Sequence, residues 1–129
     1  MGKIDVLACK VSSVLSNDTK EFGKKFMFDN QSDTCWNSDR GDTQHIQLKF
    51  NQIETVSKLC VQFQGGFAAK TIDFVREGSV VCTVYPGDEN TEQMFELPSP
   101  VECQGVKLLL RDMTDFYGRI IVYKLELLS

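Results

Sequence analysis

Apolar and polar side chains alternate along much of the chain, and this alternation predicts β-strands. In segment 45–50, Ile46, Leu48 and Phe50 fall on one face, and the polar residues between them fall on the other. The same period of two recurs in segments 58–64, 70–76, 80–85, 93–97, 106–111 and 119–128. The last segment is apolar on both faces at its start, which predicts a strand in the middle of a sheet.

Turn-forming residues separate these segments at regular intervals. Glycine, proline and serine cluster at 65–66, 78–79, 86–88, 98–100, 104–105 and 118. One helical turn is expected over 19–28, with Thr19 as its cap and Phe22, Phe26 and Met27 facing the core. Many short strands joined by turns predict an all-β fold, a sandwich or a barrel. We interpret residues 1–129 as one domain.

Composition and charge narrow the classes of partner. The chain of 129 residues has 14 Lys and Arg against 18 Asp and Glu, a net charge of −4. This balance argues against a protein that binds nucleic acid directly, because such binding depends on clustered cations. No segment approaches the roughly 18 apolar residues of a membrane span, and no secretory signal is expected near the N-terminus. The expected class is a folded domain of the nucleus or cytoplasm.

Five cysteines, an odd number, lie far apart at positions 9, 35, 60, 82 and 103. Their spacing fits neither a zinc ribbon nor a dense disulfide framework. Cys60 and Cys82 lie inside apolar strand segments, where a free thiol packs as a small hydrophobic group. We therefore expect reduced cysteines.

Motifs of common enzyme classes are absent from the sequence. His45 is the single histidine, and no G-x-S-x-G, P-loop, dinucleotide fingerprint or H-E-x-x-H is present. Nothing singles out a pair of carboxylates for acid–base chemistry. The expected function is binding without catalysis.

Segment 28–39 is rich in oxygen-bearing side chains and ends near the sole tryptophan, Trp36. Such loops suit hard cations, which take six to eight oxygen ligands. The same composition also suits a hydrogen-bonded Asx turn anchored by a buried tryptophan. From these residues alone, both interpretations remain open.

Several motifs, in order, resemble the discoidin or coagulation factor 5/8 C-domain superfamily. They are segments 12–15, 28–38, 44–50, 61–66, 116–120 and 123–127, which together span nearly the whole chain. The resemblance implies a discoidin-like, galactose-binding-like jelly-roll β-sandwich of about eight strands, with ligand loops at one end. Members of this superfamily bind sugars, phospholipids or proteins, and most are not enzymes.

The resemblance also implies a structural calcium ion. Its ligands would be Asp29, the Thr34 hydroxyl, the carbonyl groups of Phe28 and Gln31, and Glu126 from the last strand. Position 30 departs from the family pattern, because asparagine replaces the glycine expected there. The extracellular members' terminal disulfide has no counterpart here, since the segment after Glu126 contains no cysteine.

Shorter blocks are also similar to small intracellular nuclear-receptor-associated proteins. These blocks are 22–25, 34–39, 62–67 and 114–119. This similarity implies a protein partner, a nuclear receptor, which the chain would repress by covering a surface needed for dimerisation or DNA binding. The alternatives are a domain that binds a carbohydrate or another small ligand in the cleft at the loop end, and a subunit of a larger intracellular complex.

Segment 115–119 has two interpretations. In the structural one, its aromatic residues plug the core and Arg119 pairs with an acid such as Asp39 or Asp115. In the functional one, Tyr117 and Arg119 belong to a protein-recognition surface, because tyrosine and arginine are frequent interface anchors. Phe67, which follows two glycines, is a third candidate for partner binding, and packing in the core or within the loop is its alternative role. A membrane role is not expected, since a net charge of −4 is repelled by anionic headgroups.

Overall fold

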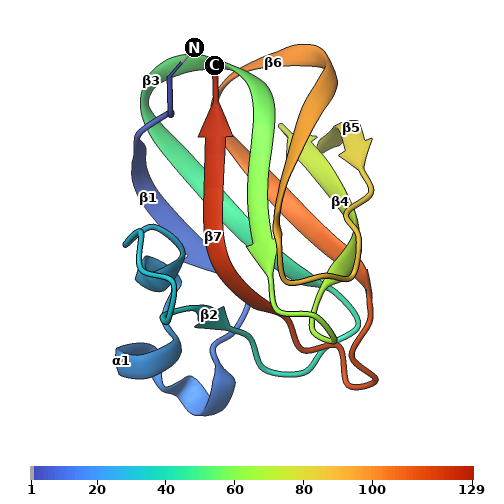
Figure 1. The fold of residues 1–129 in the computed structure, drawn as a ribbon. Helices are drawn as coiled ribbons and strands as arrows, with labels where there is room; N and C mark the ends of the chain where they lie inside the picture. The colour runs from blue at the N-terminus through green and yellow to red at the C-terminus, as the bar shows by residue number, and fades with distance from the viewer. Residues whose placement is uncertain (1) are drawn as a thin grey trace.

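The chain forms two layers of antiparallel strands with a short helical segment at one end (Figure 1). The computed structural model describes residues 2–129. Its strands are β1 (Val6–Val11), β2 (Trp36–Asn37), β3 (Gln44–Phe63), β4 (Ala69–Arg76), β5 (Ser79–Val84), β6 (Glu92–Met113) and β7 (Ile121–Leu128). The helical elements are η1 (Leu15–Asn17), α1 (Thr19–Phe22) and η2 (Lys24–Met27).

Two long strands, β3 and β6, connect the layers. They pair antiparallel along most of their length, with the ladder interrupted between Lys49 and Glu54 and again between Val56 and Lys58. Before the bend, β3 pairs with β1 and with the second half of β6, which in turn pairs with β4. After the bend, it pairs with β7 and the first half of β6. The predicted all-β sandwich is confirmed, with strand order β2-β7-β3-β6-β4-β5 and β1 beside β3.

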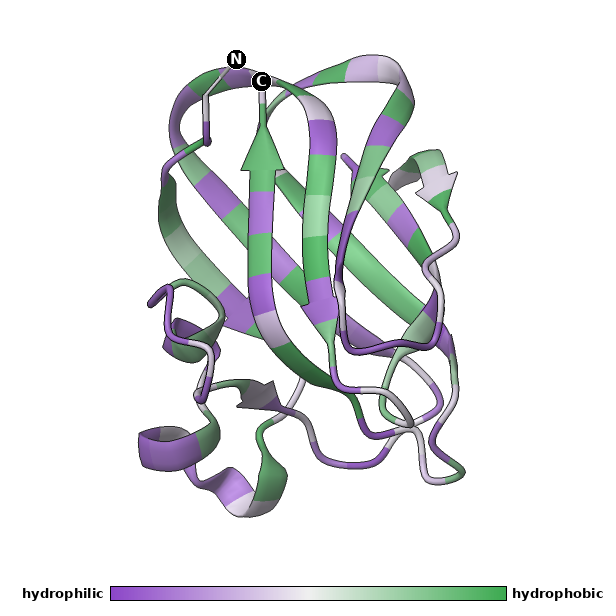
Figure 2. Cartoon of the chain, viewed as in Figure 1, coloured by the Kyte–Doolittle hydropathy of each residue, from purple (hydrophilic) through white to green (hydrophobic). Residues whose placement is uncertain are grey.

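The inward faces of the strands are those that the alternation predicts. Figure 2 shows hydrophobic and hydrophilic positions alternating along the strands. The predicted core positions that are buried are Ile46, Leu48, Phe50, Leu59, Val61, Phe63, Ile72, Phe74, Val106, Leu108 and Leu110. Each fully buried side chain of this size stabilises the fold by about 1.5–3 kcal/mol relative to an exposed one.

The last strand is central, as its two apolar faces predict. β7 lies between β2 and β3, and Ile121 and Val122 at its start are both buried. Two of the predicted turns, in contrast, lie within β6. The 98–100 segment forms the bend of that strand, where the ladder with β3 is interrupted, so the prolines leave no pairing donor missing. Gly105 pairs with Lys49.

The predicted helical turn over 19–28 is wrong in its details. It consists of two short pieces, α1 and η2, separated by extended backbone at Gly23. The cap is Asp18 rather than Thr19, because the Asp18 carboxylate accepts a hydrogen bond from the Glu21 amide. Met27 is buried, whereas Phe22 and Phe26 are half-buried.

The two ends of the described chain meet at the end of the sandwich opposite the long loops (Figure 1). The Ile4 amide donates to the Leu127 carbonyl at 2.8 Å, which joins the first residues to β7. All five cysteines are free thiols, as the sequence predicts. Within residues 2–129, the structure contains no helix with the length and apolar character that a membrane crossing requires.

Candidate functional site

Four connecting segments meet at the end of the sandwich away from the termini (Figure 1). They are 12–18 after β1, 38–43 before β3, 64–68 before β4, and 114–120 before β7. Backbone hydrogen bonds join them, including one from Ser38 to Ile120 and one from Thr114 to Ala68, both 2.9 Å long. We call this assembly the loop end.

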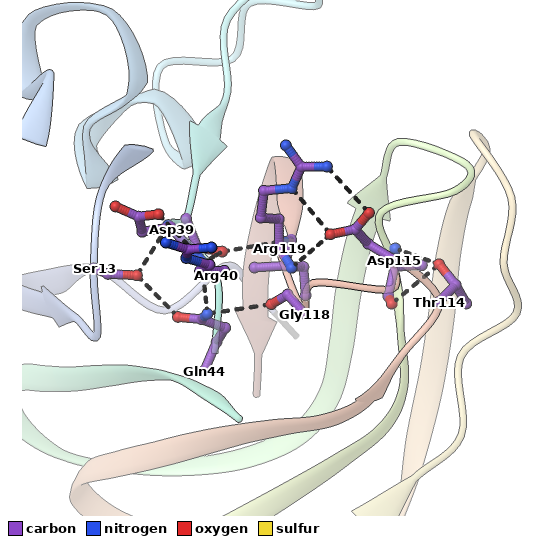
Figure 3. A network of polar contacts seen from close by, with 11 residues as sticks. Ser13, Asp39, Arg40, Gln44, Thr114, Asp115, Gly118 and Arg119 are labelled. Atoms are coloured by element: carbon purple, nitrogen blue, oxygen red, sulfur yellow. Dashed lines mark hydrogen bonds and ion pairs between the residues drawn. The ribbon is translucent and has the colours of Figure 1, made fainter. Parts of the chain in front are cut away.

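Gln44, the first residue of β3, ties three of these segments together (Figure 3). Its buried amide group donates to the carbonyl oxygens of Asp39, at 2.7 Å, and Gly118, at 3.2 Å. Its oxygen accepts hydrogen bonds from the hydroxyl groups of Ser12 and Ser13. Because a glutamine amide has both donors and acceptors, one side chain fixes the loops on both sides of it.

Gly118 allows the 114–120 loop to approach the 38–43 loop closely. Its φ is +77°, and a Cβ at this position would lie 1.8 Å from the Gly41 carbonyl oxygen. The Gly41 amide donates to the Tyr117 carbonyl at 3.0 Å. Any side chain here would therefore separate the two loops or force their backbone to move.

Phe67, Tyr117 and Arg119, which the sequence suggests as partner-binding residues, lie together at the loop end. The Arg119 guanidinium carbon is 5.4 Å from the centroid of the Phe67 ring and 5.4 Å from that of the Tyr117 ring. Distances below about 6 Å are typical of cation–π contacts. The two rings come from different loops, so Arg119 joins segment 64–68 to segment 114–120.

Asp115 orients Arg119 (Figure 3). Its carboxylate accepts hydrogen bonds from Arg119 Nε at 3.0 Å and Nη2 at 3.3 Å, and from the Arg119 backbone amide at 3.0 Å. The pKa of Asp115 is below its usual range, first because of the hydrogen bond from the Arg119 side chain. Of the two acids suggested as partners of Arg119, the structure thus selects Asp115. The two-point contact fixes the plane of the guanidinium group.

The structural interpretation of segment 115–119, in which its aromatic residues plug the core, is wrong. The Phe116 side chain is 92% exposed. It packs edge-on against Tyr117, with ring centroids 5.2 Å apart, and Tyr117 is itself 55% exposed. A sequence signal was available, since Phe116 lies outside any period-two pattern and between turn-forming residues. Two adjacent aromatic rings are thus presented to solvent on a fixed loop.

Trp36 anchors its loop in the core, as in the Asx-turn interpretation of segment 28–39. It is fully buried, and its indole N–H donates to the Ser13 carbonyl at 2.8 Å. A sugar therefore cannot stack on this ring.

The proposed calcium ligands fall into two groups. Asp29 and Thr34 lie together, because the Asp29 carboxylate accepts hydrogen bonds from the Thr34 hydroxyl at 2.5 Å and from the Gln31 amide at 3.0 Å. Asn30, between them, has a φ of +59°, the left-handed conformation that asparagine tolerates better than most residues. These contacts form the Asx turn that was the alternative interpretation of this segment.

Glu126 and Phe28 line a surface cavity of about 380 Å³, together with Lys3, Lys24 and other residues. The Glu126 carboxylate lies 3.7 Å from the Lys3 ammonium and 3.6 Å from that of Lys124. Two cations therefore already neutralise the carboxylate that would close the calcium site. As arranged, this donor set fits a divalent cation poorly, and calcium binding remains a prediction.

His45, Cys9 and Cys60, which could act as bases or nucleophiles, carry no charge at neutral pH. Burial lowers the pKa of His45, and the Lys107 ammonium lowers it further, so the imidazole is neutral at pH 7. Burial raises the pKa of the Cys9 thiol to about 11 and, together with a hydrogen bond to Glu92, that of Cys60 to about 12. These thiols are protonated at neutral pH and are poor nucleophiles.

Proteins of similar sequence share one name. No model of a known protein family matches the chain. The chain is 46% identical over 127 residues to a nuclear receptor 2C2-associated protein of Danio rerio, covering 93% of this chain and 89% of the relative. The proteins of the same name from Bos taurus and Homo sapiens are 43% and 42% identical, with the same coverage.

Solved structures with the same fold are carbohydrate-binding modules and an F5/8 type C domain. Chitosan-binding module 1 of a Paenibacillus chitosanase/glucanase has a TM-score of 0.77 at 17% identity, covering 98% of this chain and 96% of that one. An F5/8 type C domain from Bacteroides fragilis has a TM-score of 0.79 at 13% identity, with 98% and 94% covered. A family 32 module from Clostridium perfringens, in complex with galactose, has a TM-score of 0.74 at 12% identity, with 93% and 91% covered. These similarities confirm the discoidin-like sandwich.

Proposed function

The chain belongs to the family of nuclear receptor 2C2-associated proteins, and from this premise we propose that it binds a nuclear receptor as a non-catalytic intracellular module. The proposed contact surface is the cluster of Phe67, Phe116, Tyr117 and Arg119 at the loop end, called the aromatic cluster below. The observation that carries the proposal is the exposure of Phe116 and Tyr117 on a loop that hydrogen bonds hold in place.

The aromatic cluster has the chemistry of an interface anchor. Tyrosine and arginine are enriched among residues that dominate binding energy, and large exposed aromatic rings gain most from leaving water. The Arg119 side chain is already ordered by Asp115 and by two rings, so little of its conformational freedom remains to be lost on binding. A preorganised surface of this kind binds without a large rearrangement.

The proposed effect on the receptor is repression. The module would cover a receptor surface needed for dimerisation or for DNA binding. A net charge of −4 supports the second case, because an acidic domain is attracted to the basic face that contacts DNA.

The proposed location is the nucleus, the cytoplasm or both, and imaging of the tagged protein in its own cells tests it.

The binding test uses the purified chain and the nuclear receptor 2C2 of the same organism. Burial of a phenylalanine ring is worth about 1.5–3 kcal/mol, so Phe116→Ala should weaken binding by roughly 10- to 150-fold. Arg119→Lys keeps the charge but loses the two-point contact with Asp115, and it should also weaken binding.

The matched control is Ile53→Ala. Ile53 is 64% exposed and belongs to the bend of β3, at the end of the sandwich opposite the loops. Its truncation should leave receptor affinity unchanged. Equal affinities for Phe116→Ala and the unmodified chain would remove the aromatic cluster from the proposal.

Repression is tested with receptor, its DNA element and increasing amounts of the chain in a gel-shift assay. The expected result is loss of the receptor–DNA band without a slower band, and no loss with Phe116→Ala. A slower band would mean that the chain binds the DNA-bound receptor, which contradicts the covering mechanism.

Chelation tests calcium separately: an unchanged melting temperature with and without chelator would count against Asp29, Thr34 and Glu126 as ligands.

A further inference from the structure

A second surface, away from the loop end, has the opposite charge to the chain as a whole. It is a hollow of about 890 Å³ on the outer face of the layer that contains β1, β4 and β5. Its lining comes from β1, β3, β4, β5, β6 and the β4–β5 turn, and it includes none of the residues of the aromatic cluster. We call this hollow the sheet groove.

The floor of the sheet groove is formed by outward-facing residues of β3 and β6. In the paired strands, Gln47 lies opposite Lys107, and Lys49 lies opposite Gly105. Gly105 also lines the floor, and because it has no side chain it lets β6 approach the Leu48 carbonyl oxygen, which a Cβ would meet at 2.9 Å. β1 bounds the groove on one side, and the β4–β5 turn with Val80 bounds it on the other.

Three lysines give the groove its charge. Lys10, Lys49 and Lys107 line it, and Glu77 is the only acid in the lining. Between residues 2 and 129, none of these three ammonium groups forms an ion pair or a hydrogen bond with another residue. The groove is thus a net cationic site in a chain of net charge −4.

Apolar and amide side chains lie between the cations. Val75, Val80 and Leu109 line the groove, and Val80 is 57% exposed. A surface that combines separated cations with apolar patches matches a segment whose acidic and apolar residues alternate. In an extended peptide, successive side chains point to opposite sides. The acidic side chains can therefore face the lysines while the apolar side chains face the apolar lining of the groove.

We propose that the sheet groove binds an extended acidic peptide segment of a protein partner, with carboxylates at Lys10, Lys49 and Lys107 and apolar side chains against Val75, Val80 and Leu109. A peptide is favoured over a nucleic acid by charge. The remaining surface of this acidic chain repels a dense polyanion, whereas a short segment with only a few carboxylates meets mainly the local lysines. This site goes beyond the receptor surface proposed above and does not depend on it.

The test uses fluorescence anisotropy with a labelled synthetic peptide in which glutamate alternates with valine. Its control is the same peptide with glutamine in place of each glutamate. The double variant Lys49→Glu/Lys107→Glu should weaken binding of the acidic peptide by roughly tenfold or more, because two attractive contacts become repulsive. Val80→Asp, at a position that is 57% exposed, should weaken it as well.

The matched control variant is Lys20→Glu/Lys70→Glu. Both lysines are exposed and lie outside the groove lining, and this variant changes the net charge by the same amount as the groove variant. It should bind the acidic peptide within about twofold of the unmodified chain.

Four results would each overturn the proposal: no peptide binding up to about 1 mM, equal binding of the glutamine peptide, equal weakening in both double variants, or tighter binding of single-stranded DNA than of the peptide. Failure here is distinguishable from failure of the receptor surface, because the Phe116→Ala variant leaves the groove intact.

Discussion

Replacing Gln44 with leucine should detach the loops from the sandwich while keeping the volume of the side chain. Gln44 is buried at the start of β3, and its amide group makes the four hydrogen bonds that join Ser12, Ser13, Asp39 and Gly118. Leucine cannot make any of them. The bond to the Gly118 carbonyl is buried, so this acceptor loses its partner without gaining water.

The expected loss of stability follows from these contacts. An unsatisfied buried carbonyl costs about 1–3 kcal/mol, and each of the three part-buried bonds contributes about 0.5–1.5 kcal/mol net of hydrogen bonding to water. From the lower ends of these ranges, we expect a loss of about 3 kcal/mol in the free energy of unfolding. This is a large share of the roughly 5–15 kcal/mol that stabilises a typical domain.

Urea denaturation followed by tryptophan fluorescence measures the effect, because buried Trp36 is the only tryptophan. With a slope of about 1.5 kcal/mol per molar urea, the unfolding midpoint should fall by about 2 M. The control is Gln47→Leu, a surface glutamine on the same strand, which should change stability by less than about 0.5 kcal/mol. Equal midpoints for Gln44→Leu and the unmodified chain would refute the role of Gln44 as the tie between the loops.

Three further predictions concern separate features. Gly118→Ala should unfold the chain or destabilise it by more than about 3 kcal/mol in the same urea assay, whereas Gly66→Ala, which has a φ of +88° but open space around it, should cost only about 1 kcal/mol. The hydrogen bond from Arg111 lowers the pKa of Asp73, so its contribution to stability is complete above the ordinary value of 3.8 and is lost as the pH falls through the lowered pKa. Asp73→Asn should therefore flatten the acid limb of a stability–pH profile, and an unchanged limb would contradict this. Cys60, with a pKa of about 12, should resist alkylation by iodoacetamide at pH 7.5 in a mass-spectrometric time course, and rapid labelling of the folded chain would contradict its burial.

The sequence predicts the sandwich well because burial of one face of a strand requires an apolar residue at every second position. Ile46, Leu48 and Phe50 alternate with polar residues, and all three face the core. The continuity of β3 and β6 through their bends leaves no such pattern. Prolines at 98 and 100 have the composition of a loop, and only the interrupted pairing with β3 shows why a strand accommodates them.

Three of the four residues of the aromatic cluster were suggested by the sequence, but their arrangement was not. The pairing of Asp115 with Arg119 is local, four residues apart, and the sequence suggests it. The contact of Arg119 with Phe67 joins loops from distant parts of the chain, and only the fold brings them together. The exposure of Phe116 was missed because an aromatic residue before a strand is an ordinary core residue by composition.

The central position of β7 has a consequence for biosynthesis. The ribosome makes this strand after all the others, yet β2 and the second half of β3 both pair with it. While β7 is still inside the exit tunnel, the nascent chain exposes unpaired strand edges and half of an apolar interior, the features that recruit chaperones and promote aggregation. This domain therefore completes its fold only after residue 128 has left the exit tunnel. A translation stall shortly before that point leaves an aggregation-prone intermediate.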